Sequence, residues 1–228
     1  MLIRKEAVDI FKNISKVSVL FIMIILIMSA CSSARTGSTT VSSLPDTEVS
    51  SYNGQKLSPI SDLLDVSISG PQKIDINTYK LKIDGLVETP TDFTYDQVLS
   101  NTKYSKVVTI NCVEGWSAKI LWEGILLKDL FDKVKVKDTA NTVIFYCVDG
   151  FTTSLPLKTI LDGSIMIAYK INGEILPAQD GYPFMLVAEN KLGYKWAKWI
   201  VRIELSDKSG YTGYWESRGY SNDANVTN

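Results

Sequence analysis

The N-terminal part of the chain has the pattern of a targeting segment, which limits the fold to what the remaining residues can build. A basic start over residues 4–16 precedes an apolar stretch from Val17 to Met28, and small residues then lead to Cys31. This order predicts a lipoprotein signal peptide over residues 1–30, with Cys31 lipidated as the first residue of the mature chain. An uncleaved membrane helix is the alternative, but the apolar stretch is shorter than the roughly 20 residues that a span needs.

The segment after Cys31 is polar and has no apolar period. It is rich in Ser, Thr and Gly from Ser32 to about Ser58, which is typical of a flexible linker. We therefore expect a tether over residues 31–75. Its acyl chains would hold the protein at the extracytoplasmic face of the cell membrane, since more than one chain gives stable anchoring. The remaining residues, roughly 150, are enough for one domain with its own core.

Charge and residue types exclude several kinds of function. The 24 basic and 25 acidic residues nearly balance, whereas a nucleic-acid footprint needs clustered positive charge. The sequence has no histidine, which removes most haem, zinc and Ser-His-Asp chemistry. We expect no nucleic-acid partner and no haem.

Short apolar segments separated by turn residues predict an α+β fold. The capping-box pattern Thr94-Tyr-Asp-Gln97 predicts a short helix that ends near Leu99. Apolar residues at helical spacing predict another helix over 126–134, and the runs 143–148 and 151–156 flank Asp149-Gly150 as a hairpin-like pair. Further strands are expected at 79–83, 107–110, 118–122, 165–171, 184–188 and 199–205. We expect one domain over 76–210 and an aromatic C-terminal tail over 211–228.

Cys112 lies in the run Thr109-Ile-Asn-Cys-Val-Glu-Gly-Trp-Ser117, where an apolar strand passes into a loop. Such a junction holds a thiolate rigidly while leaving it accessible, and a soft thiolate suits a transition metal. Further short motifs follow in order: Trp122-Glu-Gly124, Asp149-Gly-Phe151, Ile171-Asn-Gly-Glu-Ile-Leu-Pro177, Gly181-Tyr-Pro183 and Lys198-Trp199.

In the order and spacing of these motifs, the chain resembles the sulfite oxidase-like molybdopterin-dependent oxidoreductase family from about Tyr79 to Trp199. The resemblance implies a single-domain α+β fold, the sulfite oxidase-type molybdopterin-binding fold of mixed β-sheets with short helices. It also implies a molybdopterin cofactor whose molybdenum is bound by Cys112, with Asp149 and Lys198 beside the pterin. The implied reaction moves one oxygen atom to or from a small sulfur oxyanion or a sulfoxide, and electrons pass to a separate partner.

The chain departs from the family pattern at two positions. Cofactor-bearing members typically read His-Gly-x-Pro-x-Arg, with the His and Arg holding the pterin phosphate, and this chain has Asp180 and Met185 there. An Asp repels a phosphate, and a Met offers it no charge-assisted hydrogen bond. The leader has only Arg4-Lys5 in place of paired arginines, which favours export of the unfolded chain without its cofactor. A cofactor-free binding or structural scaffold of the same fold is therefore the alternative function.

Each candidate site residue also has a structural explanation. Cys112 is a metal ligand, a disulfide partner of Cys147, or a free thiol that packs as a small hydrophobe. Asp149 suits a turn before glycine, and Lys198 suits a solvated position beside aromatic rings. Arg218 is either a contact for an oxyanion or the pterin phosphate, or part of a tail that docks through its rings.

Overall fold

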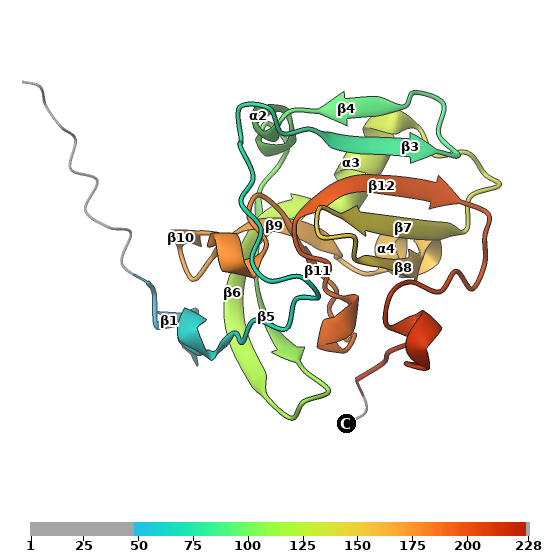
Figure 1. Cartoon of the computed structure of the whole chain (residues 1–228). Helices are drawn as coiled ribbons and strands as arrows, with labels where there is room; N and C mark the ends of the chain where they lie inside the picture. Colours follow the sequence, from blue (N-terminus) through green and yellow to red (C-terminus); the bar gives the residue numbers. More distant parts are fainter. Residues whose placement is uncertain (1–47, 227–228) are drawn as a thin grey trace, which may run out of the picture. The chain divides into compact units, whose positions relative to one another are not determined.

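The computed structural model describes residues 48–226, which lie in one compact unit of the chain. The signal peptide predicted over 1–30 and the lipidated Cys31 lie outside the described residues. Within residues 48–226, no helix is long and apolar enough to cross a membrane. Two five-stranded β-sheets, a two-stranded ribbon and short helices make up the unit (Figure 1).

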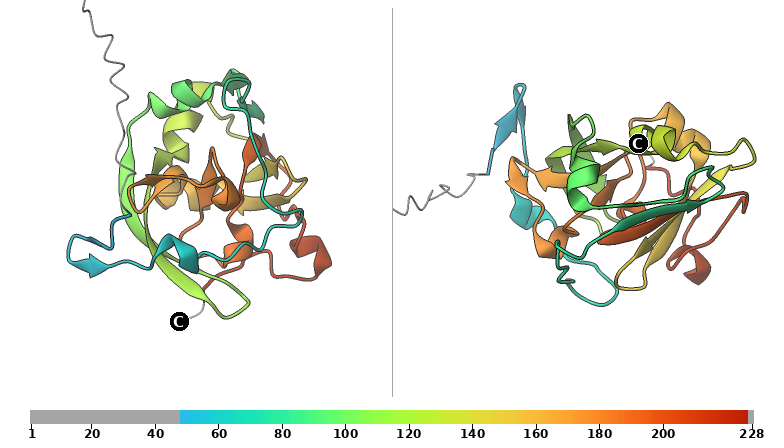
Figure 2. Two further views of the ribbon diagram at one scale, coloured as in Figure 1. Left: turned by 60° about the vertical axis from the view of Figure 1, so that its left-hand side comes forward. Right: turned by 90° about the horizontal axis from the view of Figure 1, so that it is seen from above.

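The first sheet has the strand order β10-β9-β6-β5, and β11 also pairs with β9. Its strands are β5 (Tyr104–Asn111), β6 (Ser117–Leu126), β9 (Met166–Ile171), β10 (Glu174–Ile175) and β11 (Met185–Val187), and all of its pairs are antiparallel. At Gly124, where β6 shifts register against β9, a Cβ atom would lie 2.3 Å from the Ile167 carbonyl oxygen. The long β5–β6 hairpin, seen most clearly in Figure 2, ends in the turn that carries Cys112.

The second sheet has the order β4-β3-β12-β7-β8. Its strands are β3 (Leu81–Gly85), β4 (Thr91–Phe93), β7 (Thr142–Cys147), β8 (Thr152–Pro156) and β12 (Ile200–Ser206). The central strand β12 pairs parallel with β3, placing Ile203 beside Ile83, and antiparallel with β7. The sheet is therefore mixed, and its centre comes from near the end of the chain (Figure 1).

Short helices fill the connections between strands. They are α2 (Tyr95–Leu99), α3 (Leu127–Val134), α4 (Leu157–Asp162) and the 3-10 turns η1 (Ile60–Asp62), η2 (Ala178–Asp180), η3 (Gly193–Lys195) and η4 (Glu216–Arg218). α3 buries Leu127, Leu130, Phe131 and Val134, which recur at the spacing of one helix face. α2 has the predicted capping box, with a 3.1 Å bond from the Gln97 backbone N–H to the Thr94 hydroxyl.

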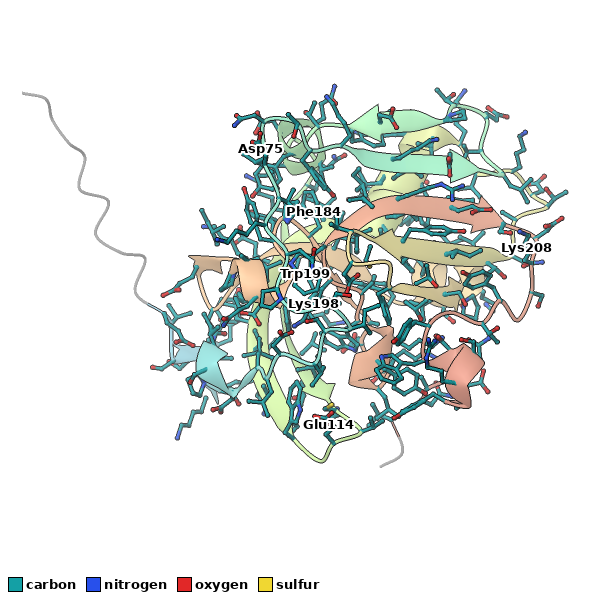
Figure 3. All side chains as sticks on the ribbon, in the orientation of Figure 1. Asp75, Glu114, Phe184, Lys198, Trp199 and Lys208 are labelled. Atoms are coloured by element: carbon teal, nitrogen blue, oxygen red, sulfur yellow. The ribbon has the colours of Figure 1, made fainter. Side chains whose placement is uncertain are left out.

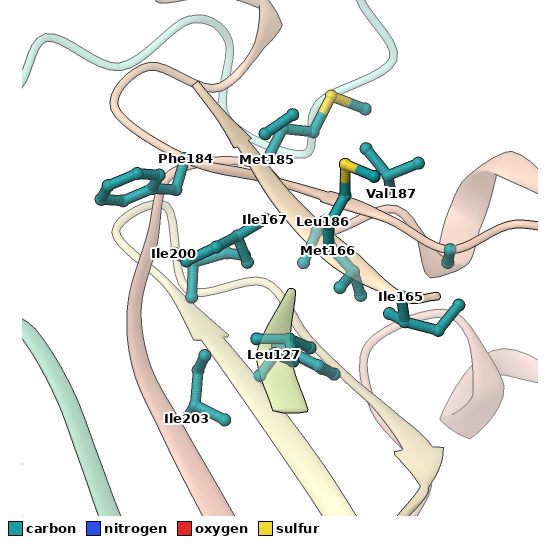
Figure 4. Close-up of a cluster of buried hydrophobic side chains, with 14 of the residues drawn as sticks. Leu127, Ile165, Met166, Ile167, Phe184, Met185, Leu186, Val187, Ile200 and Ile203 are labelled. Carbon is teal, nitrogen blue, oxygen red and sulfur yellow. The ribbon is translucent and has the colours of Figure 1, made fainter. Parts of the chain in front are cut away.

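One hydrophobic cluster connects the two sheets. Ile83, Phe145 and Ile203 of the second sheet belong to the same cluster as Ile167 and Leu186 of the first. Figure 4 draws Leu127, Ile200 and Ile203 in one cluster with side chains of β9 and β11. This shared core confirms the predicted single-domain α+β fold of mixed sheets and short helices.

The prediction of a flexible tether over 31–75 is wrong for residues 48–75. β1 (Ser51–Tyr52) and β2 (Gln55–Lys56) form a ribbon, and Leu57, Ile60 and Leu63 are buried. Glu48 accepts a 2.6 Å hydrogen bond from the Ile60 backbone N–H and a 2.8 Å bond from the Asn172 amide. Leu57, Ile60 and Leu63 anchor this polar segment, because their side chains are buried in the domain.

The aromatic tail also belongs to the fold. The Tyr214 backbone N–H donates a 2.8 Å bond to the Thr152 carbonyl, and the Tyr214 ring lies 6.3 Å from that of Phe151. At Gly213, a Cβ atom would lie 2.1 Å from the Thr152 carbonyl oxygen, so the close approach of the tail to β8 requires glycine.

Candidate functional site

A single pocket brings together residues that are far apart in the sequence. Cys112, Asp149 and Lys198 all line it, and it contains about 940 Å³ of empty space, part of which is open to solvent. Its walls come from residues 63–68, the β5–β6 turn, the β7–β8 turn, η2 and the segment 193–199, with Trp215 and Tyr220 from the tail. Figure 3 shows Lys198 and Trp199 side by side and Glu114 at the tip of the β5–β6 hairpin.

Cys112 is positioned by the tight turn that joins β5 to β6. Its backbone N–H donates a 2.9 Å bond to the Trp116 carbonyl, and Gly115 takes a left-handed conformation at φ +89°. The thiol is half-buried, and burial raises its pKa although backbone hydrogen bonds oppose this effect. Within residues 48–226, Cys112 and Cys147 are both free thiols, so the disulfide alternative is not found.

Asp149 makes the turn between β7 and β8. Its carboxylate accepts a 3.0 Å bond from the Phe151 backbone N–H, and Gly150 follows with φ +85°. Burial raises the pKa of Asp149, and Lys198 lowers it by a smaller amount. Asp149 therefore has the turn-forming role that the sequence predicted, and it also lines the pocket.

Lys198 is the only pocket residue with a cationic side chain in the described part of the chain. Its ammonium lies 3.4 Å from the Asp65 carboxylate, donates a 3.0 Å bond to the Gln179 carbonyl and sits 5.6 Å from the centre of the Trp199 ring. The Lys198 ammonium is therefore already bound by groups of the protein: a carboxylate, a backbone carbonyl and an aromatic ring.

Asp180 and Met185 are brought together with Lys198 by Gly181. At Gly181, with φ +109°, a Cβ atom would lie 3.1 Å from the Lys198 Cα and 3.2 Å from the Met185 Cβ, so glycine allows this close packing. Asp180 is 1% exposed, and its Oδ2 has no hydrogen-bond partner within residues 48–226. Burial raises the pKa of Asp180 to about 6, against the opposing effect of Lys198.

Arg218 is not brought into the pocket. Its guanidinium is exposed at the surface, donates a 2.7 Å bond to the Tyr214 carbonyl and stacks 3.6 Å from the centre of the Tyr214 ring. The neighbouring Trp215 and Tyr220 line the pocket instead. The structure thus gives Arg218 the docking role and does not place it where it could replace a phosphate-binding arginine.

Aromatic side chains form much of the pocket wall, and the sequence analysis did not anticipate them. They are Trp116, Phe151, Tyr194, Trp196, Trp199, Trp215 and Tyr220. The sequence signal was the gathering of tryptophan and tyrosine over 194–220. The strand and turn positions that aim these rings at one cavity are set by long-range packing, which no local pattern reveals.

Comparison with known proteins matches this region to a family of enzymes. The family model "Oxidoreductase molybdopterin binding domain" matches residues 68–215. The Bacillus subtilis (strain 168) protein "Uncharacterized oxidoreductase YuiH" is 34% identical over 151 residues, which are 66% of this chain and 76% of the relative.

Two further matches cover a smaller share of longer proteins. "Putative protein-methionine-sulfoxide reductase subunit YedZ1" of Azospira oryzae (strain ATCC BAA-33 / DSM 13638 / PS) is 32% identical, over 66% of this chain and 57% of the relative. The crystal structure of the sulfane dehydrogenase SoxCD from Paracoccus pantotrophus matches at 26% identity with a TM-score of 0.59, over 61% of this chain and 41% of that chain.

Proposed function

This chain belongs to the oxidoreductase molybdopterin binding domain family, and we propose that it uses the family pocket to bind a small organic molecule without the pterin cofactor. The observation that carries the proposal is the buried Asp180 carboxylate, which has one oxygen without a partner and lies beside Met185. By the family pattern that the sequence resembles, these two positions would be a His and an Arg.

The pocket does not fit the phosphate end of molybdopterin. Glu114, Asp149 and Asp180 contribute carboxylates, and Lys198 contributes the one cation among the described lining residues. Two like unit charges about 5 Å apart repel by about 3 kcal/mol at an effective dielectric constant near 20. A doubly charged phosphate would therefore meet repulsion at Asp180, and Met185 gives it no compensating donor.

The metal end of the cofactor meets a single protein ligand. Cys112 is a half-buried thiol whose pKa is raised by burial, and metal binding requires the thiolate. One thiolate is the protein ligand that the family resemblance implies, so Cys112 suits the metal end. The misfit lies at the phosphate end, where Asp180 and Met185 stand.

A second candidate function is the family reaction itself. It is supported by the position of Cys112 at the pocket with Asp149 and Lys198, and by the Azospira oryzae relative that is named as a putative protein-methionine-sulfoxide reductase subunit. In that case the protein would transfer an oxygen atom to or from a small sulfur oxyanion or a sulfoxide, with a separate electron-transfer partner.

Molybdenum content separates the two candidates. Two preparations are compared: leaderless protein from the cytoplasm of a molybdopterin-producing host, and exported protein. In both we expect less than about 0.1 molybdenum atoms per chain, because the pocket offers the cofactor phosphate no cationic donor at positions 180 and 185. Metal analysis by mass spectrometry gives this ratio. The matched variant carries Asp180→His and Met185→Arg, which restores the family donors and is expected to raise molybdenum in the leaderless form. Stoichiometric molybdenum in the natural sequence, lost in Cys112→Ala, would establish the oxidoreductase instead.

We also propose that the protein is a lipoprotein of the extracytoplasmic membrane face, anchored through Cys31. The small residues before Cys31 and the apolar run that precedes them support this proposal. We expect Cys31→Ser to abolish lipid labelling and leave a precursor with its leader, while Cys112→Ser, the control, changes neither. Mass spectrometry of a mature chain that starts elsewhere, or that carries no acyl chains on Cys31, would contradict the anchor.

A further inference from the structure

We infer that the ligand of this pocket is an organic cation, a quaternary ammonium or an amine with an apolar body and a hydrogen-bond acceptor. The inference rests on the proposed cofactor-free function and names the class of molecule that the same site takes. Four features support it: the charge of the walls, their aromatic faces, two unsatisfied polar atoms and an apolar rim.

The charge of the walls is negative. Three lining residues, Glu114, Asp149 and Asp180, are acidic, and the one lining cation, Lys198, is already held by Asp65 and the Gln179 carbonyl. A cleft lined by charge of one sign concentrates ligands of the opposite sign. The pocket therefore favours a cation over an anion or a neutral molecule.

The aromatic faces suit a soft organic cation better than a small hydrated one. Trp116, Trp196, Trp199 and Trp215 all line the cavity, and tryptophan gives the strongest cation–π attraction of the aromatic side chains. The Lys198 ammonium, 5.6 Å from the centre of the Trp199 ring, already makes a contact of this type inside the pocket.

Two residues that line the pocket each have a buried polar atom without a partner within residues 48–226. These atoms are the Asp180 Oδ2, an acceptor, and the Trp116 Nε1, a donor. A buried polar group without a hydrogen bond costs about 1–3 kcal/mol. A ligand with a cationic group for Asp180 and an acceptor for Trp116 would satisfy both atoms.

The rim of the pocket is apolar and exposed. Leu64, Val66 and Val113 line it and are 50%, 38% and 47% exposed. Exposed apolar side chains that gather around a cavity are typical of a binding site. They would cover the apolar body of a ligand whose charged group lies deeper, near Asp180.

Binding can be tested with choline and benzyltrimethylammonium, using quenching of the pocket tryptophans as the signal. We expect saturable quenching by both cations, and binding weaker by about tenfold or more for the uncharged tert-butyl isostere of choline. Asp180→Asn should weaken cation binding by a similar factor, and Trp116→Phe should weaken choline by several-fold because the N–H and part of the aromatic face are lost. Asp92→Asn, an exposed carboxylate on β4, is the matched control and should change nothing.

Equal binding of the isostere, unchanged binding in Asp180→Asn, or no saturable quenching by either cation would overturn the inference. Unfolding curves of Asp180→Asn verify that the variant is folded. Molybdenum is measured on the same preparation, so that a failure of the proposed cofactor-free function can be distinguished from a failure of the proposed ligand class. Stoichiometric molybdenum overturns the proposed function, whereas a molybdenum-free protein that binds neither cation overturns only the ligand class.

Discussion

Replacing Glu216 with Gln will lower the free energy of unfolding by about 3–5 kcal/mol, because it leaves a buried ammonium without its counter-ion. The side chains of Lys195 and Glu216 are both 0% exposed, and their charged atoms are 2.5 Å apart. Thr153 also donates to Glu216, and Lys195 donates to the Ser154 carbonyl. The pair thus ties the tail to β8. Urea unfolding monitored by circular dichroism measures the change.

The matched control is Glu88→Gln, in a pair where Lys135 and Glu88 are 68% and 60% exposed and 3.6 Å apart. We expect that substitution to cost less than about 1 kcal/mol. Burial lowers the pKa of Lys195 and Glu216 opposes this, so the penalty of Glu216→Gln should shrink at alkaline pH, where Lys195 can lose its proton. A cost as small as that of Glu88→Gln would show that the pair is not needed.

Asp180→Asn should stabilise the protein at neutral pH by up to about 3 kcal/mol, which corresponds to a pKa difference of about two units. The pKa of Asp180 is about 6 in the folded chain against its usual 3.8, so the folded state binds the proton more tightly. The contribution of Asp180 to stability is then greatest below 3.8 and is lost as the pH rises through 6. The stability gained by Asp180→Asn should therefore rise as the pH increases from 3.8 to about 6 and disappear below 3.8.

Chemical unfolding at a series of pH values checks this, with Asp92→Asn as a flat reference. The charged groups that face Asp180 are Lys198 and Asp65, and Lys198 is kept in both proteins. A gain that does not depend on pH, or a loss of stability, would contradict the prediction. Such a carboxylate in a pocket wall is compatible with ligand binding, since a ligand that binds only the folded state stabilises it.

Local patterns predicted those parts of the fold that local interactions determine. The Thr94 capping box defined the start of α2, and the apolar face of α3 gave its position closely. The strand predicted over 151–156 was confirmed by β8, but α4, directly after Pro156, was not predicted because its six residues are too few to show a helical period. The packing of residues 48–75 was missed because a polar composition hides the three side chains that anchor it.

The site was predicted in part, and by resemblance rather than by spacing. The family resemblance predicted that Cys112, Asp149 and Lys198 share one site, and in the structure all three line one pocket. The aromatic walls and the burial of Asp180 depend on contacts between segments more than 60 residues apart, such as 110–116 with 180–199. Of the two roles predicted for Arg218, the structure has the docking one, because the Tyr214 carbonyl and ring take its guanidinium.

The parallel pairing of β12 with β3 determines when the chain can complete its fold. β12 is the central strand of its sheet, between β3 and β7, yet it is the last strand in the sequence. Until Ser206 has been synthesised, β3–β4 and β7–β8 have no strand to join them, and contacts this distant in sequence form slowly. A nascent chain therefore stays without its complete second sheet until nearly all of the domain has been synthesised.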